Sequence, residues 1–176
     1  MIIISLGSNV TSWWGTPPTT ILHALHELDE IGIDVVRQSE LYRTTPYGIT
    51  DQPVFINAAA VIRTAFAPAT LLTVLKKIEA KAGRKATQRW GPRALDIDIV
   101  DYNARILNYP NNERQLNKTA ALPLILPHPG VQSRPFVLQP MLDIAPYWHH
   151  PVSGKGLGEL LRRLRFCDGG NILEML

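Results

Sequence analysis

The feature that most constrains this chain is a basic loop that runs directly into a strand carrying two acids, at Arg89–Val100. From Leu95 to Val100 the residues are apolar or β-branched except for Asp96 and Asp98. Residues i and i+2 of a strand face the same side, so the two carboxylates share one face while their apolar neighbours point into a core. Two neighbouring carboxylates repel each other unless a cation lies between them. The pattern therefore predicts a metal site on one face of a β-sheet.

Basic residues precede this strand closely enough to act on the same ligand. The loop carries Arg84, Lys85, Arg89 and Arg93, and Arg93 lies three positions before Asp96. Arginine binds phosphate oxygens through paired hydrogen bonds, and carboxylates with water suit magnesium. Acids that hold a metal beside bases that hold phosphate are typical of phosphoryl-transfer sites. Taken alone, an acid pair can also be a solvated strand face, and a basic loop can be a surface connection.

A second pattern in the sequence indicates that the ligand is flat. The strand predicted over residues 54–63 has one apolar face, and its opposite face begins with Phe55 and Asn57. An aromatic ring beside an amide suits a flat polar heterocycle, although ordinary packing accounts for both residues equally well. Trp90 is either a core residue or a cover over a bound nucleotide, and His128, between two prolines, is either structural or a donor to phosphate.

The order of the predicted elements is β-α-β-β-α-β. Prolines open both helices and glycines end them, and the ranges are strands at 2–6, 33–43, 54–63 and 95–100 and helices at 17–31 and 68–82. This order predicts an α+β fold, a ferredoxin-like antiparallel sheet with both helices on one face and the other face free. Further elements are expected as a strand at 122–126 and as short helices at 136–142 and 157–165.

Length and composition limit the number of domains and the kinds of partner that the chain can have. The 176 residues predict one domain, 1–176, with a core at 1–145 and a C-terminal extension at 146–176. A net charge of +3 suits a small anionic ligand and does not demand nucleic acid, and one cysteine excludes a disulfide framework. No apolar run reaches the length of a membrane span. We expect a cytoplasmic monomer that binds neither membrane nor nucleic acid.

Two suggestive patterns fail closer inspection. His149 and His150 lack a third metal ligand nearby in the sequence. Gly154-Lys155 does not match a phosphate-binding loop, because the earlier glycine is missing and Gly156 replaces the required hydroxyl residue. No dinucleotide-binding glycine pattern follows a strand.

From Ile3 to about Ile144 the chain resembles the 6-hydroxymethyl-7,8-dihydropterin pyrophosphokinases of folate synthesis. The strongest element is Arg-Trp-Gly-Pro-Arg-x-Leu-Asp-Ile-Asp-Ile at 89–99. Weaker elements follow in the order of the family, at 6–9, 42–44, 51–57, 78–79, 83–84, 127–129 and 134–136. One departure is Pro123, where some members carry an arginine, and Arg114 or Lys118 is the candidate substitute.

The resemblance implies that pyrophosphate moves from ATP to the hydroxymethyl group of the dihydropterin and that AMP leaves. It implies two Mg²⁺ ions held by Asp96 and Asp98, which form the catalytic set together with Arg84 and Arg93. The implied ATP-binding residues are Glu79, Arg84, Trp90, Arg93, Ile99, His128 and Arg134. The implied pterin-binding residues are Thr44, Thr45, Tyr47, Phe55, Asn57, Asp96 and Phe136.

Two other classes of protein remain compatible with the predicted fold. Polymerases and nucleotide cyclases also place paired aspartates on a ferredoxin-like sheet, but they need a template channel or a dimer interface. An RNA-recognition module shares the strand order, but it needs exposed aromatic residues on its central strands. Phe55 is the one candidate for that role.

Overall fold

An antiparallel sheet forms the middle of the computed structural model, which describes residues 1–84, 90–110, 124–164 and 169–176. Its strands within these residues are β1 (Ile2–Ser8), β2 (Asp34–Gln38), β3 (Tyr42–Thr44), β4 (Phe55–Arg63), β5 (Asp96–Tyr102) and β6 (Ile172–Met175). They lie in the order β5-β1-β4-β3-β6, and β2 also pairs with β4. The α+β class and the ferredoxin-like order of the core are confirmed.

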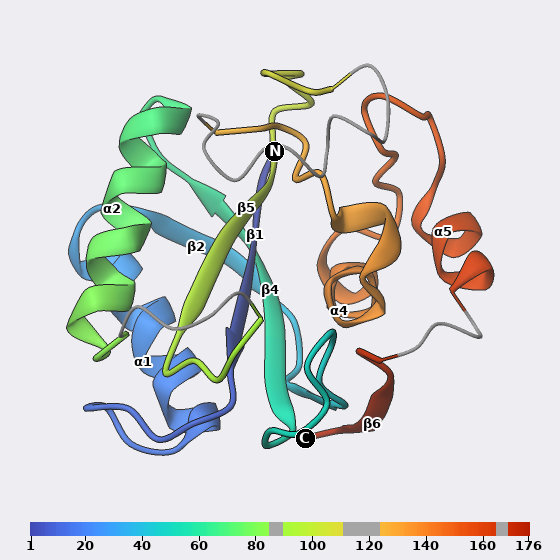
Figure 1. Ribbon diagram of the computed structural model, residues 1–176. Coiled ribbons are helices and arrows are strands. Elements are labelled where there is room, and N and C mark those ends of the chain that lie inside the picture. Colours follow the sequence, from blue (N-terminus) through green and yellow to red (C-terminus); the bar gives the residue numbers. More distant parts are fainter. Residues whose placement is uncertain (85–89, 111–123, 165–168) are drawn as a thin grey trace.

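Helices cover both faces of this sheet (Figure 1). On one face lie α1 (Pro17–Glu30) and α2 (Pro68–Lys81), where the sequence predicts them. On the other face lie α4 (Pro135–Ile144) and α5 (Leu157–Arg163), and a 3₁₀ turn at Val131–Ser133 precedes α4. Both predicted short helices therefore form, and α4 is longer than expected by one residue at its start and two at its end.

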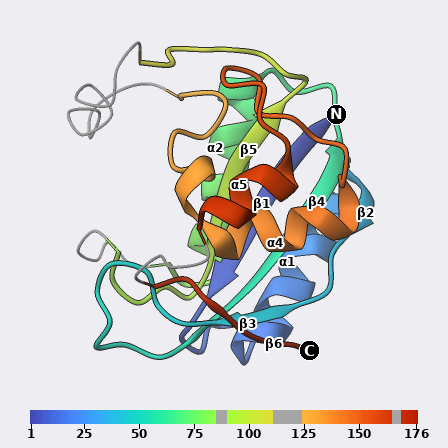
Figure 2. The ribbon, with the colours of Figure 1, turned by 90° about the vertical axis from the view of Figure 1, so that its right-hand side faces the viewer.

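The sheet face opposite α1 and α2 is only partly free, which corrects the prediction that this whole face is uncovered. Helix α4 packs on Ile3, Ala59, Val61 and Val100, all of which are buried on that face. Figure 2 shows α4 and α5 in front of the sheet. An RNA-recognition module needs its central strands exposed, and here a helix covers part of them. The uncovered part of this face is left for a site.

The strand predicted over 33–43 is divided into β2 and β3, and Ser39 explains why. The hydroxyl of Ser39 accepts a hydrogen bond from the Ala59 backbone N–H at 2.9 Å, in place of a strand carbonyl. The backbone N–H of Ser39 still donates to the Ala59 carbonyl at 2.9 Å. Gln38 pairs with Ala60 and Tyr42 with Asn57, so the register shifts by one residue. A side chain that competes for ladder hydrogen bonds produces this kind of bulge.

The C-terminal part holds a strand that the sequence does not predict. Strand β6 pairs antiparallel with the edge strand β3. The strand predicted at 122–126 is not formed in its described part, where Leu126 makes only an isolated bridge with Leu107. Residues 111–123 lie outside the described chain, and so do Arg114, Lys118 and Pro123. No helix within the described residues is long and apolar enough to cross a membrane.

Candidate active site

The site is built on two rows of residues that run across β4, β1 and β5. In the first row Gly7 of β1 stands opposite Asn57 and Asp96. In the second row Ser5 stands opposite Ala59 and Asp98. Because side chains alternate along a strand, both rows face the same side. The middle strand supplies only small residues, so the floor between the amide and the carboxylates stays open.

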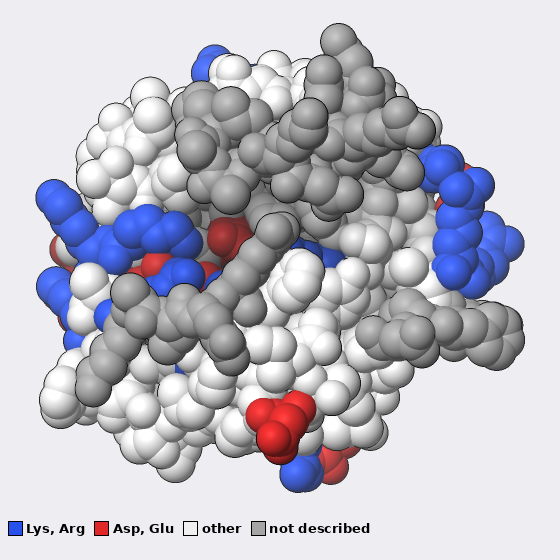
Figure 3. Space-filling model, in the orientation of Figure 1, with Lys and Arg blue, Asp and Glu red and all other residues white. Residues whose placement is uncertain are grey.

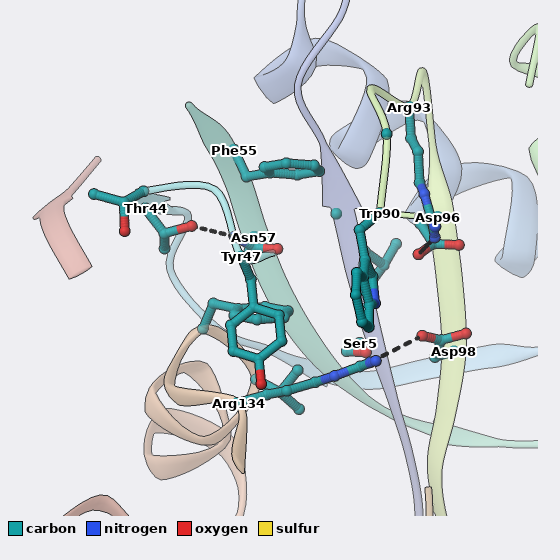
Figure 4. A pocket seen from close by; sticks show the side chains of 16 residues that line it. Ser5, Thr44, Tyr47, Phe55, Asn57, Trp90, Arg93, Asp96, Asp98 and Arg134 are labelled. Carbon is teal, nitrogen blue, oxygen red and sulfur yellow. Dashed lines mark hydrogen bonds and ion pairs between the residues drawn. The ribbon is translucent and has the colours of Figure 1, made fainter. Parts of the chain in front are cut away.

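A pocket lies over these rows (Figure 4). Most of the residues predicted for the site line it together: Thr44, Thr45, Tyr47, Phe55, Asn57, Trp90, Arg93, Asp96, Asp98, Arg134 and Phe136. Aromatic and amide residues form one end, and the two aspartates form the other. The structure therefore brings these residues together around one pocket, and their individual roles stay predictions.

Asp96 is held by cations from three segments of the chain. One Asp96 oxygen accepts a hydrogen bond from Arg84 at 2.6 Å, and the other accepts one from Arg93. Lys76, on α2, lies 4.0 Å from the same carboxylate. Burial alone lowers the pKa of Arg84, but Asp96 and Glu79 raise it above its ordinary value, so the guanidinium stays charged. Figure 3 shows basic side chains gathered around acidic ones over α2 and β5.

Asp98 has a second set of basic neighbours. Its carboxylate lies 3.7 Å from Arg134, 3.7 Å from His128 and 3.8 Å from Lys76. Burial alone raises the pKa of Asp98, but His128 when protonated, together with Lys76, Arg134 and Arg93, outweighs burial and lowers the pKa below its ordinary value. The carboxylate is therefore ionised at neutral pH and available to a divalent cation.

His128 presents a proton donor toward the acidic end. Its Nδ1 accepts a hydrogen bond from the backbone N–H of Gly130 at 3.0 Å, so Nε2 carries the proton of a neutral ring. Nε2 faces Asp98 at 3.7 Å and Arg134 at 3.4 Å. Burial lowers the pKa of His128, although Asp98 acts in the opposite direction. A neutral imidazole N–H in this place suits a phosphate oxygen.

Glu79 lies beneath the site and is almost fully buried. It accepts hydrogen bonds from the backbone N–H of Ile97 at 2.6 Å and from Lys76 at 2.7 Å, and it also pairs with Arg84. Burial raises the pKa of Glu79, against the effect of Lys76. In this arrangement Glu79 braces two cations of the site and the strand that carries Asp96. Its predicted contact with ATP stays a prediction.

At the aromatic and amide end of the pocket, called the ring end below, the side-chain amide of Asn57 is held in one orientation. Asn57 donates from Nδ2 to the hydroxyl of Thr44 at 2.8 Å, and Asn57 is buried. Its Oδ1 lies over the floor, 2.9 Å from where a Cβ on Gly7 would lie. The acceptor oxygen thus faces the space above Gly7, where it can accept an N–H from a ligand. The rings of Tyr47 and Phe136 lie beside this space, with centroids 5.7 Å apart.

Trp90 stands between the two ends in the view of Figure 4. It has a positive φ of 64°, which is uncommon for an aromatic residue and needs support from its surroundings. The carbonyl of Trp90 accepts a hydrogen bond from Gln52 at 2.8 Å. Gln52 in turn accepts one from Asn9 at 3.1 Å, and Asn9 accepts one from the Arg93 backbone N–H at 2.7 Å. Asn9 and Gln52 therefore tie three loops together around the pocket.

Other predicted residues lie elsewhere or remain outside the described chain. The side chain of Ile99 is buried in the core on the α1 and α2 side, as its place in the strand alternation requires. Lys85 and Arg89 fall within residues 85–89, which are not described, so their predicted action on a phosphate ligand stays a prediction. Lys76 was not predicted; its spacing of three from Glu79 on a helix was the available signal.

The donor set at the acidic end fits a hard divalent cation. Two carboxylates, from Asp96 and Asp98, face one pocket, while the described residues hold no group of three or more His, Cys, Asp or Glu placed so that together they could bind a metal ion. Mg²⁺ typically binds through one or two carboxylates and completes its shell with water and substrate phosphates. The surrounding cations suit those phosphates. The chemistry therefore matches a metal that arrives with a polyphosphate.

Comparison with known proteins identifies the family. Residues 3–146 match the family model of 7,8-dihydro-6-hydroxymethylpterin-pyrophosphokinase. The chain belongs to this family. One relative, from Synechocystis, is named "2-amino-4-hydroxy-6-hydroxymethyldihydropteridine pyrophosphokinase". It is 37% identical over 163 residues, which cover 92% of this chain and 75% of that protein. A protein of the same name from Methylorubrum extorquens is 39% identical, over 92% and 91% of the two chains.

Longer members of the pyrophosphokinase family contain a similar segment. The folic acid synthesis protein fol1 of Pneumocystis carinii is 37% identical over 99% of this chain. This chain spans only 22% of the length of that protein. A crystal structure of Plasmodium falciparum HPPK-DHPS has a TM-score of 0.65 at 18% identity and covers 92% of this chain and 43% of that one. At this identity the structure supports the fold alone.

Proposed function

We propose that this chain transfers the terminal pyrophosphoryl unit of ATP to the hydroxymethyl oxygen of 6-hydroxymethyl-7,8-dihydropterin and releases AMP. The new bond joins that oxygen to the β-phosphorus, and the bond between the β-phosphorus and the bridging oxygen to the α-phosphate breaks. The observation that carries the proposal is the position of Asp96 and Asp98, between a slot for a flat ring and a cluster of cations. Membership of the pyrophosphokinase family supports it independently.

The ring end accounts for the acceptor substrate. Phe55, Tyr47 and Phe136 offer apolar surfaces to a flat bicyclic ring. Asn57 directs its Oδ1 to the floor, where the amino and N–H edge of a pterin can donate to it. Residues Thr44 and Thr45 add polar groups to the same wall. A ring bound there directs its hydroxymethyl arm toward the two aspartates.

The cationic end accounts for the donor substrate. Arg84, Arg93, Arg134 and Lys76 surround the carboxylates, and each can turn from a carboxylate to a phosphate oxygen. Arginine and lysine lower the barrier by stabilising the charge that develops during in-line transfer. His128 adds a neutral N–H donor at the same end. Positioning and charge neutralisation then supply the catalysis, without a dedicated general base.

Asp96 and Asp98 would hold Mg²⁺, two ions in this proposal, together with the triphosphate. Held by these two carboxylates, such a metal would supply Lewis-acid stabilisation of the charge on the phosphates and on the attacking hydroxyl. The carboxylates contribute by staying ionised, which the lowered pKa of Asp98 supports. Arg84 and Arg93 hold Asp96 in place until phosphates arrive. We also propose that the chain acts in the cytoplasm as a monomer, as one domain with a core at 1–145.

The nature of the nucleotide product tests this proposal. Incubation with ATP, Mg²⁺ and the hydroxymethyl-dihydropterin should give AMP and the pterin diphosphate in equal amounts, measured by chromatography. Formation of ADP would contradict attack at the β-phosphorus and indicate an ordinary kinase. Unchanged ATP in the presence of all three components would contradict the function itself.

A further inference from the structure

The last eight residues of the chain lie against the wall of the ring pocket. Strand β6 pairs with β3, so that Thr44 stands opposite Ile172. The contact then continues beyond both strands: the Thr45 N–H donates to the Asn171 carbonyl at 2.9 Å, and the Asn171 N–H donates to the Thr45 hydroxyl at 2.9 Å. Figure 2 shows β6 alongside β3. These residues lie beyond the stretch that the family model matches, which ends at residue 146.

The tail supports the part of the wall where the sheet ends. Pairing of β3 with β4 runs as far as Thr44 and Phe55. Beyond that point the tail continues to bond the wall, because the Gly170 N–H donates to the Pro46 carbonyl at 3.3 Å and Gly169 bridges to Tyr47. Thr44, Thr45 and Tyr47 all line the pocket. The tail thus fixes backbone that carries ring-contacting side chains.

Gly170 packs directly against two aromatic rings of the pocket. A Cβ at this position would lie 2.6 Å from Cδ1 of Phe136 and 3.5 Å from Cδ2 of Tyr47. The first distance is shorter than any real contact of such atoms, so the Phe136 ring would have to move. The backbone of Gly170 therefore lies directly against the Phe136 ring, which also lines the pocket, and limits how far that ring can move. A side chain held by packing in one orientation binds a ligand without first losing freedom.

We propose that residues 169–171 are positioning residues for the dihydropterin: they set the affinity for the ring by holding Phe136 and the 45–47 wall, and they do not touch the nucleotide. This inference rests on the proposed function. The cations assigned to the phosphates come from α2 and the residues just after it, from the loop before β5, and from the 128–134 turn. A disturbance of the tail should therefore weaken binding of the pterin and leave binding of the nucleotide almost unchanged.

Gly170→Ala tests the inference, with Gly154→Ala as the matched control. Both glycines belong to the C-terminal extension and have the same backbone conformation, with φ of +69° and +68°. A Cβ at Gly154 meets nothing within 4 Å, so the control reproduces the backbone strain without the contact with Phe136. Calorimetry should show pterin binding about tenfold weaker in Gly170→Ala than in Gly154→Ala, since loss of one stacking contact is of that order. Affinity for a non-hydrolysable ATP analogue should agree within about twofold.

Steady-state kinetics give a readout that a general loss of structure would not. Gly170→Ala should raise KM for the pterin with kcat almost unchanged at saturation, because the phosphate end is intact. Glu174→Gln, which removes an exposed ion pair between β6 and Arg43 of β3, should change neither constant. Equal pterin affinity in both alanine variants, with wild-type binding intact, would overturn this inference alone. A wild type that binds no pterin would overturn the proposed function as well.

Hydrogen exchange of the unaltered protein covers the case in which Gly170→Ala does not fold. Bound pterin should slow exchange of the Thr45 and Gly170 amides, whose hydrogen bonds join the tail to the wall. The ATP analogue alone should leave both amides unchanged. Exchange that is identical with and without pterin would contradict the proposal.

Discussion

Asp98→Ala is expected to lower kcat by about 10³-fold or more while the protein stays folded. Asp98 is one of two carboxylates at the acidic end, and its neighbours keep it ionised. Its side chain is 30% exposed and its ion pairs are at 3.7–3.8 Å, so their loss should change the free energy of unfolding by only about 1 kcal/mol. Rates of AMP formation across a magnesium series, together with thermal unfolding, measure both effects.

Asp96→Ala should be similarly inactive but less stable, since Asp96 holds Arg84 and Arg93, which are both more buried than exposed. Asp34→Ala is the matched control: Asp34 is also a strand aspartate in an ion pair, with Arg63 at 2.9 Å, but it lies on β2, which β4 and β1 separate from the strand of the two site aspartates. Its activity should equal that of the wild type. Full activity of Asp98→Ala, or an unchanged response to magnesium, would count against the assignment of the carboxylates to the metal.

Arg93→Ala is expected to lower kcat by about 10²- to 10³-fold and to leave pterin affinity within about threefold. The guanidinium of Arg93 bonds Asp96 at the acidic end, while the ring end is formed by Phe55, Tyr47 and Phe136. A cation that stabilises charge only during transfer affects the rate more than binding. Single-turnover rates and calorimetric titration with the pterin separate the two effects.

Arg63→Ala provides the control for Arg93→Ala. Arg63 is the arginine of an exposed ion pair and should cost less than about 1 kcal/mol of stability and no activity. If Arg93→Ala weakened pterin binding as much as it slowed the reaction, Arg93 would have a structural role. Since the backbone N–H bond to Asn9 is kept in this variant, that role would belong to the side-chain bond with Asp96.

Spacing alone predicted two pairs of this site, and the other site residues, such as Thr44, Tyr47 and Phe136, were implied by the family resemblance. Period-two alternation gave the shared face of Asp96 and Asp98 and that of Phe55 and Asn57. The register across the sheet was not predictable in this way. That Gly7 separates Asn57 from Asp96 depends on pairing between segments about 50 and 90 residues apart.

Parts that depend on tertiary contacts were missed for the same reason. Lys76 reaches both aspartates from a helix, and its own sequence surroundings suggest a solvated position. The covered face of the sheet did leave a signal, because Ile3, Val61 and Val100 are apolar on the side predicted to be free. Strand β6 left little signal: it has four residues and pairs with a strand about 130 positions earlier.

The most direct measurement is a calorimetric titration of the wild type with the pterin, alone and with Mg²⁺ and a non-hydrolysable ATP analogue. The ring slot and the cationic cluster meet at the two aspartates, so a bound magnesium nucleotide should complete the wall of the slot. We expect the pterin to bind at least about tenfold more tightly when the metal and nucleotide are present, within the usual range of coupling between sites. The same affinity in both conditions, or no pterin binding at all, would contradict the account.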